Sequence, residues 1–211
     1  MKYIFFDVDG VLINGYHANE LYRRRWDENL ERDLGIKPED LKNAFFDRDF
    51  GDVVTGKKDL HKALSDILPE INFKGTAKTL VDYWLERDSV VNGSVLEIVA
   101  SLKKNPAHRL FIATHQEKNR AHHLWHELGF KDYFEEIFFS GRMGVRKTDP
   151  EFFNLIEKEL CLTEGDCLLI DDDPVVIQSA RNAGWKTILF ETADRLQQEL
   201  EKLSPSSLWK E

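Results

Sequence analysis

The feature that most constrains this chain is a short apolar run, Tyr3-Ile4-Phe5-Phe6, that leads directly into Asp7-Val8-Asp9-Gly10. The run has the length and composition of a buried strand in a parallel sheet. Side chains two apart in an extended chain point the same way, so Asp7 and Asp9 could share one polar site at the end of the strand. A tight turn beginning at Gly10 would instead aim the carbonyl and the carboxylate of Asp9 in different directions. Carboxylates at this end of a buried strand lie where open α/β sheets bind ligands, and a solvated acidic loop is the plainer alternative.

Three more polar segments recur later in the chain. Thr114 ends the run Leu110-Phe111-Ile112-Ala113, and Asp171-Asp172-Asp173 follows Cys167-Leu168-Leu169-Ile170. Lys147 lies in residues 144–150, just before a helical pattern. Each has an ordinary structural reading on its own: a strand hydroxyl with a local hydrogen bond, a surface lysine, and a helix N-cap with first-turn acids before a proline. The three readings, together with an acidic loop at the first strand, would require four coincidences.

Taken in order, these four segments resemble the four motifs of the haloacid dehalogenase superfamily, whose first motif is Asp-x-Asp-Gly followed by apolar residues. The resemblance covers residues 1 to about 14 and about 90 to 200. Within this superfamily, the chain resembles the phosphatase branch that carries a helical cap, and it is similar to the sugar phosphatases of subfamily I. The resemblance implies an α/β fold: a Rossmann-like parallel sheet of strand order 5-4-1-2-3 with an inserted α-helical cap. That order would bring the strand ends at Asp7, Thr114 and Asp171 together.

The composition agrees with a globular enzyme and narrows its partners. Hydrophobic residues make up 42% of the 211 residues and charged residues 32%, which is enough apolar material for a core. The net charge of −9 argues against nucleic acid and against an anionic membrane surface. Two cysteines, a start that enters a strand directly, and no apolar stretch of transmembrane length predict a cytoplasmic protein. A monomer or a homodimer is expected.

The spacing of apolar residues predicts a core of residues 1–14 and 89–211, with a helical cap over 15–88. The first expected cap helix carries Leu21, Trp26, Leu30 and Leu34 and ends at Gly35. A second begins at Pro38, with Leu41, Ala44 and Phe45 on one face, and a loop over 47–56 follows it. A third carries Leu60, Ala63, Leu64 and Ile67, and Thr76 caps a fourth. The expected core alternates helices with strands. Its helices are expected over 92–105, 117–128, 150–160, 174–183 and 192–203, and its strands over 109–114, 137–139, 167–170 and 186–190. Residues 204–211 are expected to form a loose tail.

The resemblance assigns a role to each motif residue. Asp7 would be the nucleophile that forms an aspartyl-phosphate, and Asp9 would act as general acid and then as general base. Thr114 would donate its hydroxyl to phosphoryl oxygens, and Lys147 would neutralise negative charge. The same resemblance implies a Mg²⁺ site made of the Asp7 carboxylate, the backbone carbonyl of Asp9, and an acid of the last motif. Both Asp171 and Asp172 fall on motif positions; Asp172 is favoured as the direct ligand, with Asp171 acting through water, but the choice stays open.

Electrostatics independently favour a cation in such a site. Two carboxylates about 4 Å apart repel by roughly 4 kcal/mol at an effective dielectric constant of 20. Three or four acids on one sheet edge therefore need a divalent ion and a lysine to neutralise them. Asp173 is set apart from this group, because Pro174 suits a first helical position and Asp173 its cap.

Substrate binding is less well marked in the sequence. Many related phosphatases carry Asn after the second-motif Thr and Pro after the lysine, whereas this chain has His115 and Thr148. His115 is a candidate substrate contact, as are Thr114 and Lys147. In the cap, Arg48 and Lys57 are candidate phosphate or sugar contacts, with solvated loops as the alternative. His122 and His126 are one helical turn apart, but they lack the further ligands that a zinc site needs.

Several functions remain open. The presence of Asp9 favours a phosphatase, and the alternative is a phosphomutase of the β-phosphoglucomutase type. Members that displace halide, and the phosphonate-cleaving branch, lack an acid at this position. A two-component receiver domain also has an acid cluster, a Thr and a Lys, but its acid pair ends the first strand, whereas Asp171-Asp172 ends the fourth here. A catalytically inactive binding relative is disfavoured because all four motifs stand.

Overall fold

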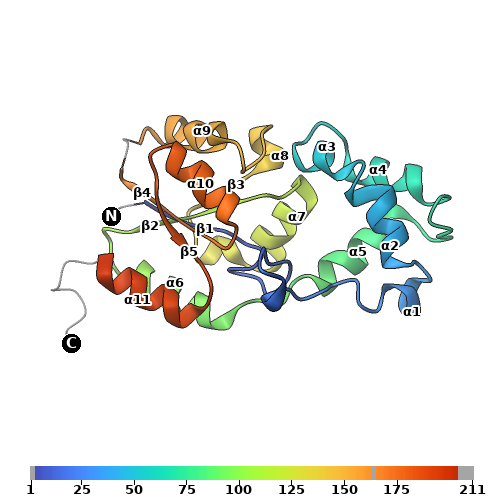
Figure 1. The fold of residues 1–211 in the computed structure, drawn as a ribbon, viewed down its shortest axis with the longest axis horizontal. Coiled ribbons are helices and arrows are strands. Elements are labelled where there is room, and N and C mark those ends of the chain that lie inside the picture. The colour runs from blue at the N-terminus through green and yellow to red at the C-terminus, as the bar shows by residue number, and fades with distance from the viewer. Residues whose placement is uncertain (1–2, 163–164, 204–211) are drawn as a thin grey trace.

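The computed structural model describes residues 3–162 and 165–203 and shows one parallel sheet (Figure 1). Its strands are β1 (Tyr3–Phe6), β2 (Arg109–Thr114), β3 (Glu136–Phe139), β4 (Cys167–Asp171) and β5 (Lys186–Leu189). The order across the sheet is β3-β2-β1-β4-β5, which is 5-4-1-2-3 counted from the other edge. The predicted α/β class is confirmed, and each predicted strand matches an observed one to within one residue at either end.

Helices cover both faces of the sheet because side chains alternate along each buried strand. Ile4 and Phe6 of β1 face a cluster shared with α6 (Gly93–Lys103), α7 (Lys118–His122) and α11 (Ala193–Leu203). Tyr3 and Phe5 face the opposite cluster, with α9 (Pro150–Leu160) and α10 (Pro174–Asn182). The central strand β1 is thereby buried on both sides, and its exit is fixed in position.

A separate group of helices lies between β1 and α6 in the chain and extends beyond the carboxyl ends of the strands (Figure 1). We call residues 20–87 the helical cap. Its elements are η1 (Glu20–Tyr22), α1 (Leu30–Leu34), α2 (Pro38–Leu41), η2 (Lys42–Phe46), α3 (Phe50–Val54), α4 (Leu60–Ile67) and α5 (Ala77–Arg87). These helices bury a hydrophobic cluster of their own, rich in aromatic rings such as Trp26, Phe45 and Trp84. The boundary predicted at residues 15–88 stays a prediction.

The cap touches the core closely at two glycines. A Cβ atom at Gly51 would collide with the guanidinium of Arg146, and one at Gly56 would lie 2.6 Å from the carbonyl oxygen of Gly141. Gly56 also has φ of +73°, a conformation that favours glycine. The absence of side chains at these points allows the cap backbone to approach the Arg146 side chain and the Gly141 backbone of the core.

Two cap predictions were wrong. The loop predicted over 47–56 contains helix α3, because Phe50, Val53 and Val54 present one apolar face that outweighs Gly51 and the charges. The long helix predicted to carry Leu21 and Trp26 is only η1 and α1, with non-helical residues between them; Leu21 is 89% exposed and does not belong to a buried stripe.

The remaining predicted helices are confirmed, with small additions. Thr76 and Asp173 cap α5 and α10 through their side chains, as expected. The helix over 117–128 is α7 followed by a π-helical turn, η3 (His123–Glu127). Two short elements were not predicted, η4 (Phe130–Asp132) and α8 (Ser140–Met143). The predicted tail over 204–211 lies outside the described residues, and among the helices that are described none is long and apolar enough to cross a bilayer.

Phe5 offers a test of this core. Its ring is fully buried, with centroids 5.0 Å from Phe111 and 4.5 Å from Trp185. Phe5→Ala should lower the free energy of unfolding by about 3–5 kcal/mol, since it removes buried area and leaves a cavity. Urea denaturation measures the change, and Leu21→Ala, at an exposed site, should stay within about 0.5 kcal/mol of the wild type. Equal losses in the two variants would contradict the packing described.

Candidate active site

The four motif segments meet at the carboxyl ends of the central strands. Asp7 directly follows β1, Thr114 ends β2, and Asp171 ends β4. The Lys147 ammonium lies 2.8 Å from Asp7 Oδ1 and 2.5 Å from Asp171 Oδ2. One carboxylate oxygen from each of Asp7, Asp171 and Asp172 lies within 4.8 Å of the other two. The structure therefore brings Asp7, Lys147, Asp171 and Asp172 together.

The chain leaves β1 through a tight turn. Gly10 has φ of +78°, and a Cβ atom there would lie 2.5 Å from Asp172 Oδ2. Only glycine fits both the backbone conformation and the approach of this carboxylate. The turn directs the Asp9 carboxylate away from the cluster, toward Gln116 and Arg120. Of the two geometries that the sequence left open, the turn is therefore the one observed.

Burial makes this cluster electrostatically costly. Desolvation, partly offset by the charge of Lys147, raises the pKa of Asp7 to about 7. Desolvation and the nearby charge of Asp7 raise the pKa of Asp172 to about 7, and burial also raises the pKa of Asp171. For Lys147, burial alone would lower the pKa, but the charges of Asp171 and Asp7 together raise it. One ammonium faces three carboxylates, so the site holds an excess of negative charge.

This donor set fits Mg²⁺. The ion prefers carboxylate, carbonyl and water oxygens, and the cluster offers three carboxylates without sulfur or imidazole ligands in the set. A divalent charge would also relieve the repulsion that raises the carboxyl pKa values. Asp7, Asp171 and Asp172 can therefore hold the metal. The predicted use of the Asp9 carbonyl stays a prediction.

Thr114 is placed to contact a ligand. Its side chain is 1% exposed, and its Oγ1 has no hydrogen-bond partner within the described parts of the chain. A buried hydroxyl without a partner is costly unless a ligand or water completes it. The ordinary reading, a strand hydroxyl satisfied locally, does not hold here.

The Asp172 carboxylate is also held from the loop that follows the turn. The Ala18 N–H donates to Asp172 Oδ2 at 2.6 Å, and His17 Nδ1 lies 3.2 Å from the same oxygen. The Asn19 N–H donates to His17 Nδ1, so a neutral ring carries its proton on Nε2 and Nδ1 does not donate to Asp172. Sequence reasoning missed His17, because nothing in the local pattern indicates that it reaches a residue 155 positions away.

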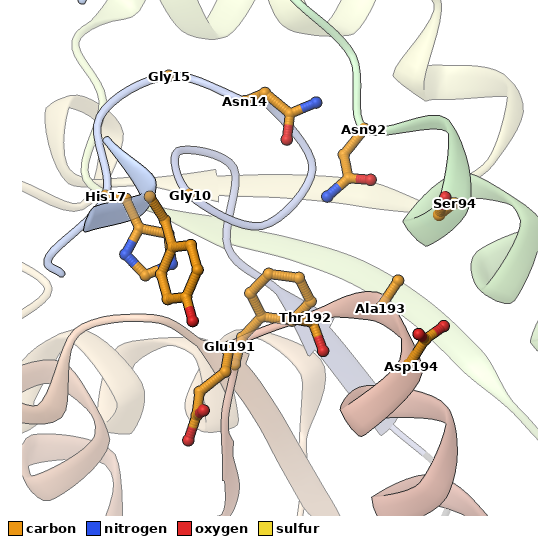
Figure 2. A pocket seen from close by; sticks show the side chains of 12 residues that line it. Gly10, Asn14, Gly15, His17, Asn92, Ser94, Glu191, Thr192, Ala193 and Asp194 are labelled. Carbon is orange, nitrogen blue, oxygen red and sulfur yellow. The ribbon is translucent and has the colours of Figure 1, made fainter. Parts of the chain in front are cut away.

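His17 also lines a polar cavity of about 370 Å³. Figure 2 shows Gly10, Asn14 and Gly15 of the loop after β1 on one side, and Glu191, Thr192 and Asp194 on another. The start of α6, at Asn92 and Ser94, completes the wall. His17 thus lies between this cavity and Asp172.

A larger cavity, of about 520 Å³, lies between the cap and the loop that carries Lys147. From the cap it is lined by α3 and the residues after it, including Thr55 and Lys57, and from the core by Arg146 and Thr148. Arg48 does not line it; its guanidinium pairs with Asp49 and Glu70 on the cap surface. The structure therefore places Lys57, but not Arg48, beside a cavity.

The sequence profile of the haloacid dehalogenase-like hydrolases matches residues 1–184. The chain belongs to this family. Among curated relatives, flavin mononucleotide hydrolase 1 of Arabidopsis thaliana is 35% identical over 77 residues, which are 36% of this chain and 31% of that protein. The bifunctional epoxide hydrolase 2 of Sus scrofa is 27% identical over 94% of this chain and 38% of its own length. The chain spans between 13% and 38% of the length of the three relatives it matches.

The fold recurs in solved members of the same family. A haloacid dehalogenase family enzyme from Bacteroides thetaiotaomicron, solved as a magnesium complex, superposes with a TM-score of 0.73 at 20% identity, over 90% of this chain and 93% of that one. At this identity the likeness shows the fold alone.

His115 and Thr148 are departures of this family member from the motifs it otherwise matches. His115 follows Thr114 and is mostly buried. Burial, together with the charges of Lys147 and Arg146, lowers its pKa to about 4, so the imidazole is neutral near pH 7. It can donate or accept a hydrogen bond at the site, but it adds no charge. Its predicted contact with substrate stays a prediction.

The His122–His126 pair does not form a metal site with a third ligand. The rings lie 4.5 Å apart, but the three-acid cluster is the one group of three or more candidate ligands within the described residues. Sequence reasoning did miss two residues beside this site, Gln116 and Arg120, both buried and both in contact with Asp9. No signal in the local sequence pattern marks either residue, because polar side chains are ordinary at the start of a helix.

The lowered pKa of His115 predicts an acid-sensitive stability. The unfolded chain takes up the proton near the ordinary value of 6.5, so the stability is complete above that pH and is lost as pH falls toward 4. His115→Gln should therefore lose less unfolding free energy than the wild type between pH 7 and pH 5, by on the order of 2 kcal/mol. Urea denaturation at both pH values measures this, with exposed His126→Gln as the control. An unchanged pH dependence in His115→Gln would contradict it.

Proposed function

We propose that this protein is a Mg²⁺-dependent phosphatase that hydrolyses a small phosphorylated metabolite through an aspartyl-phosphate intermediate. The observation that carries the proposal is Lys147, buried between Asp7 and Asp171 at the edge of a three-carboxylate cluster. The flavin mononucleotide hydrolase among the relatives acts, by its name, on a phosphate monoester, which supports this class of reaction.

The residues divide the chemistry between them. An oxygen of Asp7 attacks phosphorus in line, and the bond to the leaving oxygen breaks as Asp9 donates a proton to it. Asp9, now a carboxylate, then takes a proton from the water that hydrolyses the aspartyl-phosphate. Thr114 donates a hydrogen bond from its unpartnered hydroxyl to a phosphoryl oxygen. The fixed positive charge of Lys147 stabilises the negative charge that the phosphoryl group and Asp7 share.

Mg²⁺ would be held by Asp7, Asp172 and the Asp9 carbonyl, with Asp171 acting through water. When bound, it supplies positive charge against the phosphoryl oxygens. The magnesium complex of the Bacteroides enzyme, which shares the fold, supports this assignment.

The cavity of about 520 Å³ is the proposed place for the rest of the substrate. Lys57 and Arg146 give it two cations, Asp52 and Asp149 two carboxylates, and Thr55 and Thr148 two hydroxyls. This mixed polar lining suits a polar, hydroxyl-bearing molecule such as a sugar phosphate. A screen of sugar phosphates, nucleotides and phosphorylated organic acids for released phosphate tests the substrate class. Isomerised sugar phosphate without release would indicate the phosphomutase instead.

Removal of the metal should abolish activity. Hydrolysis of 4-nitrophenyl phosphate should require Mg²⁺ and stop in excess chelator, since the acids would be left without their counter-charge. At ten times its dissociation constant, the ion should add about 1.4 kcal/mol of stability and roughly 3–6 °C of melting temperature. Activity that persists in chelator would exclude the Mg²⁺ assignment.

Two substitutions separate the roles of the first two acids. Asp7→Asn removes the nucleophile, so no covalent intermediate forms and turnover should fall to background. Asp9→Asn should lower kcat by about 10²- to 10⁴-fold, the usual contribution of a positioned acid or base. Its kcat/KM should fall far less on 4-nitrophenyl phosphate than on an alkyl phosphate, because nitrophenolate leaves without a proton.

Rapid quench and intact mass would reveal an added phosphoryl group in Asp9→Asn, whose intermediate lacks the base for hydrolysis. The Asp7→Asn variant should never acquire that mass. Wild-type rates in Asp7→Asn would end the covalent mechanism, and wild-type rates in Asp9→Asn on the alkyl ester would end the acid–base role of Asp9.

A further inference from the structure

Arg120 of α7 is a charged side chain buried in the core beside the proposed site. It is 1% exposed, although a guanidinium is costly to remove from water unless carboxylates face it. The carboxylates that meet it are Asp9 of the first motif and Asp88, the residue that ends helix α5 of the cap. The sequence separates these three residues by 79 and 32 positions, and the fold brings them together.

A single nitrogen makes all of these contacts. Arg120 Nη2 donates to Asp9 Oδ1 at 2.8 Å and to the carbonyl oxygen of Asp88 at 2.9 Å, and it lies 3.2 Å from Asp88 Oδ2. Its Nε and Nη1 have no hydrogen-bond partner within the described residues. Two of the three nitrogens of the guanidinium therefore make no hydrogen bond to a described residue, and the third links Asp9 to Asp88.

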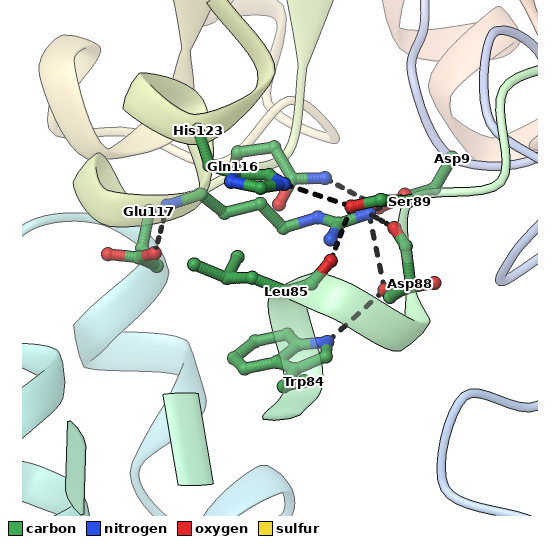
Figure 3. A network of polar contacts seen from close by, with 9 residues as sticks. Asp9, Trp84, Leu85, Asp88, Ser89, Gln116, Glu117 and His123 are labelled. Atoms are coloured by element: carbon green, nitrogen blue, oxygen red, sulfur yellow. Dashed lines mark hydrogen bonds and ion pairs between the residues drawn. The ribbon is translucent and has the colours of Figure 1, made fainter. Parts of the chain in front are cut away.

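The other oxygen of Asp9 is also held. Gln116 Nε2 donates to Asp9 Oδ2 at 2.5 Å, and Gln116 is itself buried. With one donor on each oxygen, the Asp9 carboxylate cannot rotate without breaking a hydrogen bond. Figure 3 shows Asp9, Gln116 and Asp88 converging on this network.

The network continues into the cap. Asp88 Oδ2 accepts a hydrogen bond from the indole Nε1 of Trp84 at 3.2 Å, and Trp84 packs in the hydrophobic cluster of the cap. The next residue, Ser89, pairs with His123 Nε2 at 3.0 Å (Figure 3). Asp88 is thus fixed from the cap side, and Arg120 is anchored on a residue that does not move independently of α5.

We infer that Arg120 is the positioning residue for the acid–base carboxylate Asp9, anchored by Asp88 where the cap joins the core. This inference rests on the proposed phosphatase function. Arg120 does not touch the reacting atoms; it acts by fixing the direction in which Asp9 presents its oxygens. General acid catalysis depends on such alignment, because a proton donor must lie within hydrogen-bond reach of the leaving oxygen.

The test uses Arg120→Met, which keeps much of the length of the side chain but removes the charge and the donors. On an alkyl phosphate, kcat/KM should fall by about 10- to 100-fold, as part of the usual acid–base contribution. On 4-nitrophenyl phosphate, kcat/KM should fall by less than about 3-fold, because the leaving group needs no proton and substrate binding is untouched. Arg120→Lys, which keeps the charge and is the safer variant for folding, should show the same asymmetry with a smaller loss, because the lysine side chain is one bond shorter and its ammonium does not reach the position of Nη2.

A double-mutant cycle separates positioning from a merely structural role. In the Asp9→Asn background, Arg120→Met should cause little further loss on the alkyl ester, because the group that it positions has already gone. Leu124→Ala, from the same helical stretch and fully buried, is the matched control: it should lower stability but leave the ratio of the two kcat/KM values unchanged.

Two outcomes would overturn the inference. One is an equal loss on both esters in Arg120→Met and Arg120→Lys, and the other is a full additional loss in the Asp9→Asn background. Either result, with an active wild type, leaves the proposed function standing. A wild type without phosphatase activity on any ester would instead remove the proposed function, and the inference with it.

Discussion

The buried ion pairs of Lys147 are the interaction on which the rest of the site depends. A lysine that is 1% exposed keeps its charge only because Asp7 and Asp171 lie within 2.8 Å of its ammonium. Without the lysine, burial would strongly destabilise the charged forms of Asp7 and Asp171. Strands β1 and β4 must therefore be neighbours with their ends level, and the register that pairs Phe6 with Ile170 achieves this. The order of the strands in the sheet and the neutralisation of the buried charges therefore depend on each other.

The turn after β1 divides the two acids of the first motif between different surroundings. Asp7 remains in the cluster, whereas Asp9 is turned toward Gln116 and Arg120. Two carboxylates that repel each other are thereby separated and given different partners, as different chemical roles require. Gly10 makes this possible, because any other residue would meet both a strained backbone and the Asp172 carboxylate.

The helical cap is a second packing unit that meets the core at a few defined points. Its aromatic cluster is independent of the two clusters that flank the sheet. Contact with the core is made where glycines allow close approach, at Gly51 and Gly56, and where Asp88 reaches Arg120. The cavity of about 520 Å³ lies between the two units, so residues from both would determine which molecules enter it.

The sequence by itself determined the strands, most helices and the members of the acidic cluster. Buried parallel strands are continuous apolar runs, so local pattern was sufficient for the strands, whereas the members of the acidic cluster followed from the resemblance of the four motifs to a known family. Helix α3 was missed although its apolar face was visible, because glycine and charge were given more weight than periodicity. Tertiary structure alone decided that Asp9 turns away from Asp7, that Arg48 pairs within the cap, and that His17, Gln116 and Arg120 reach motif acids. These are contacts between residues far apart in the chain, and no local periodicity records which distant side chain a buried charge will find.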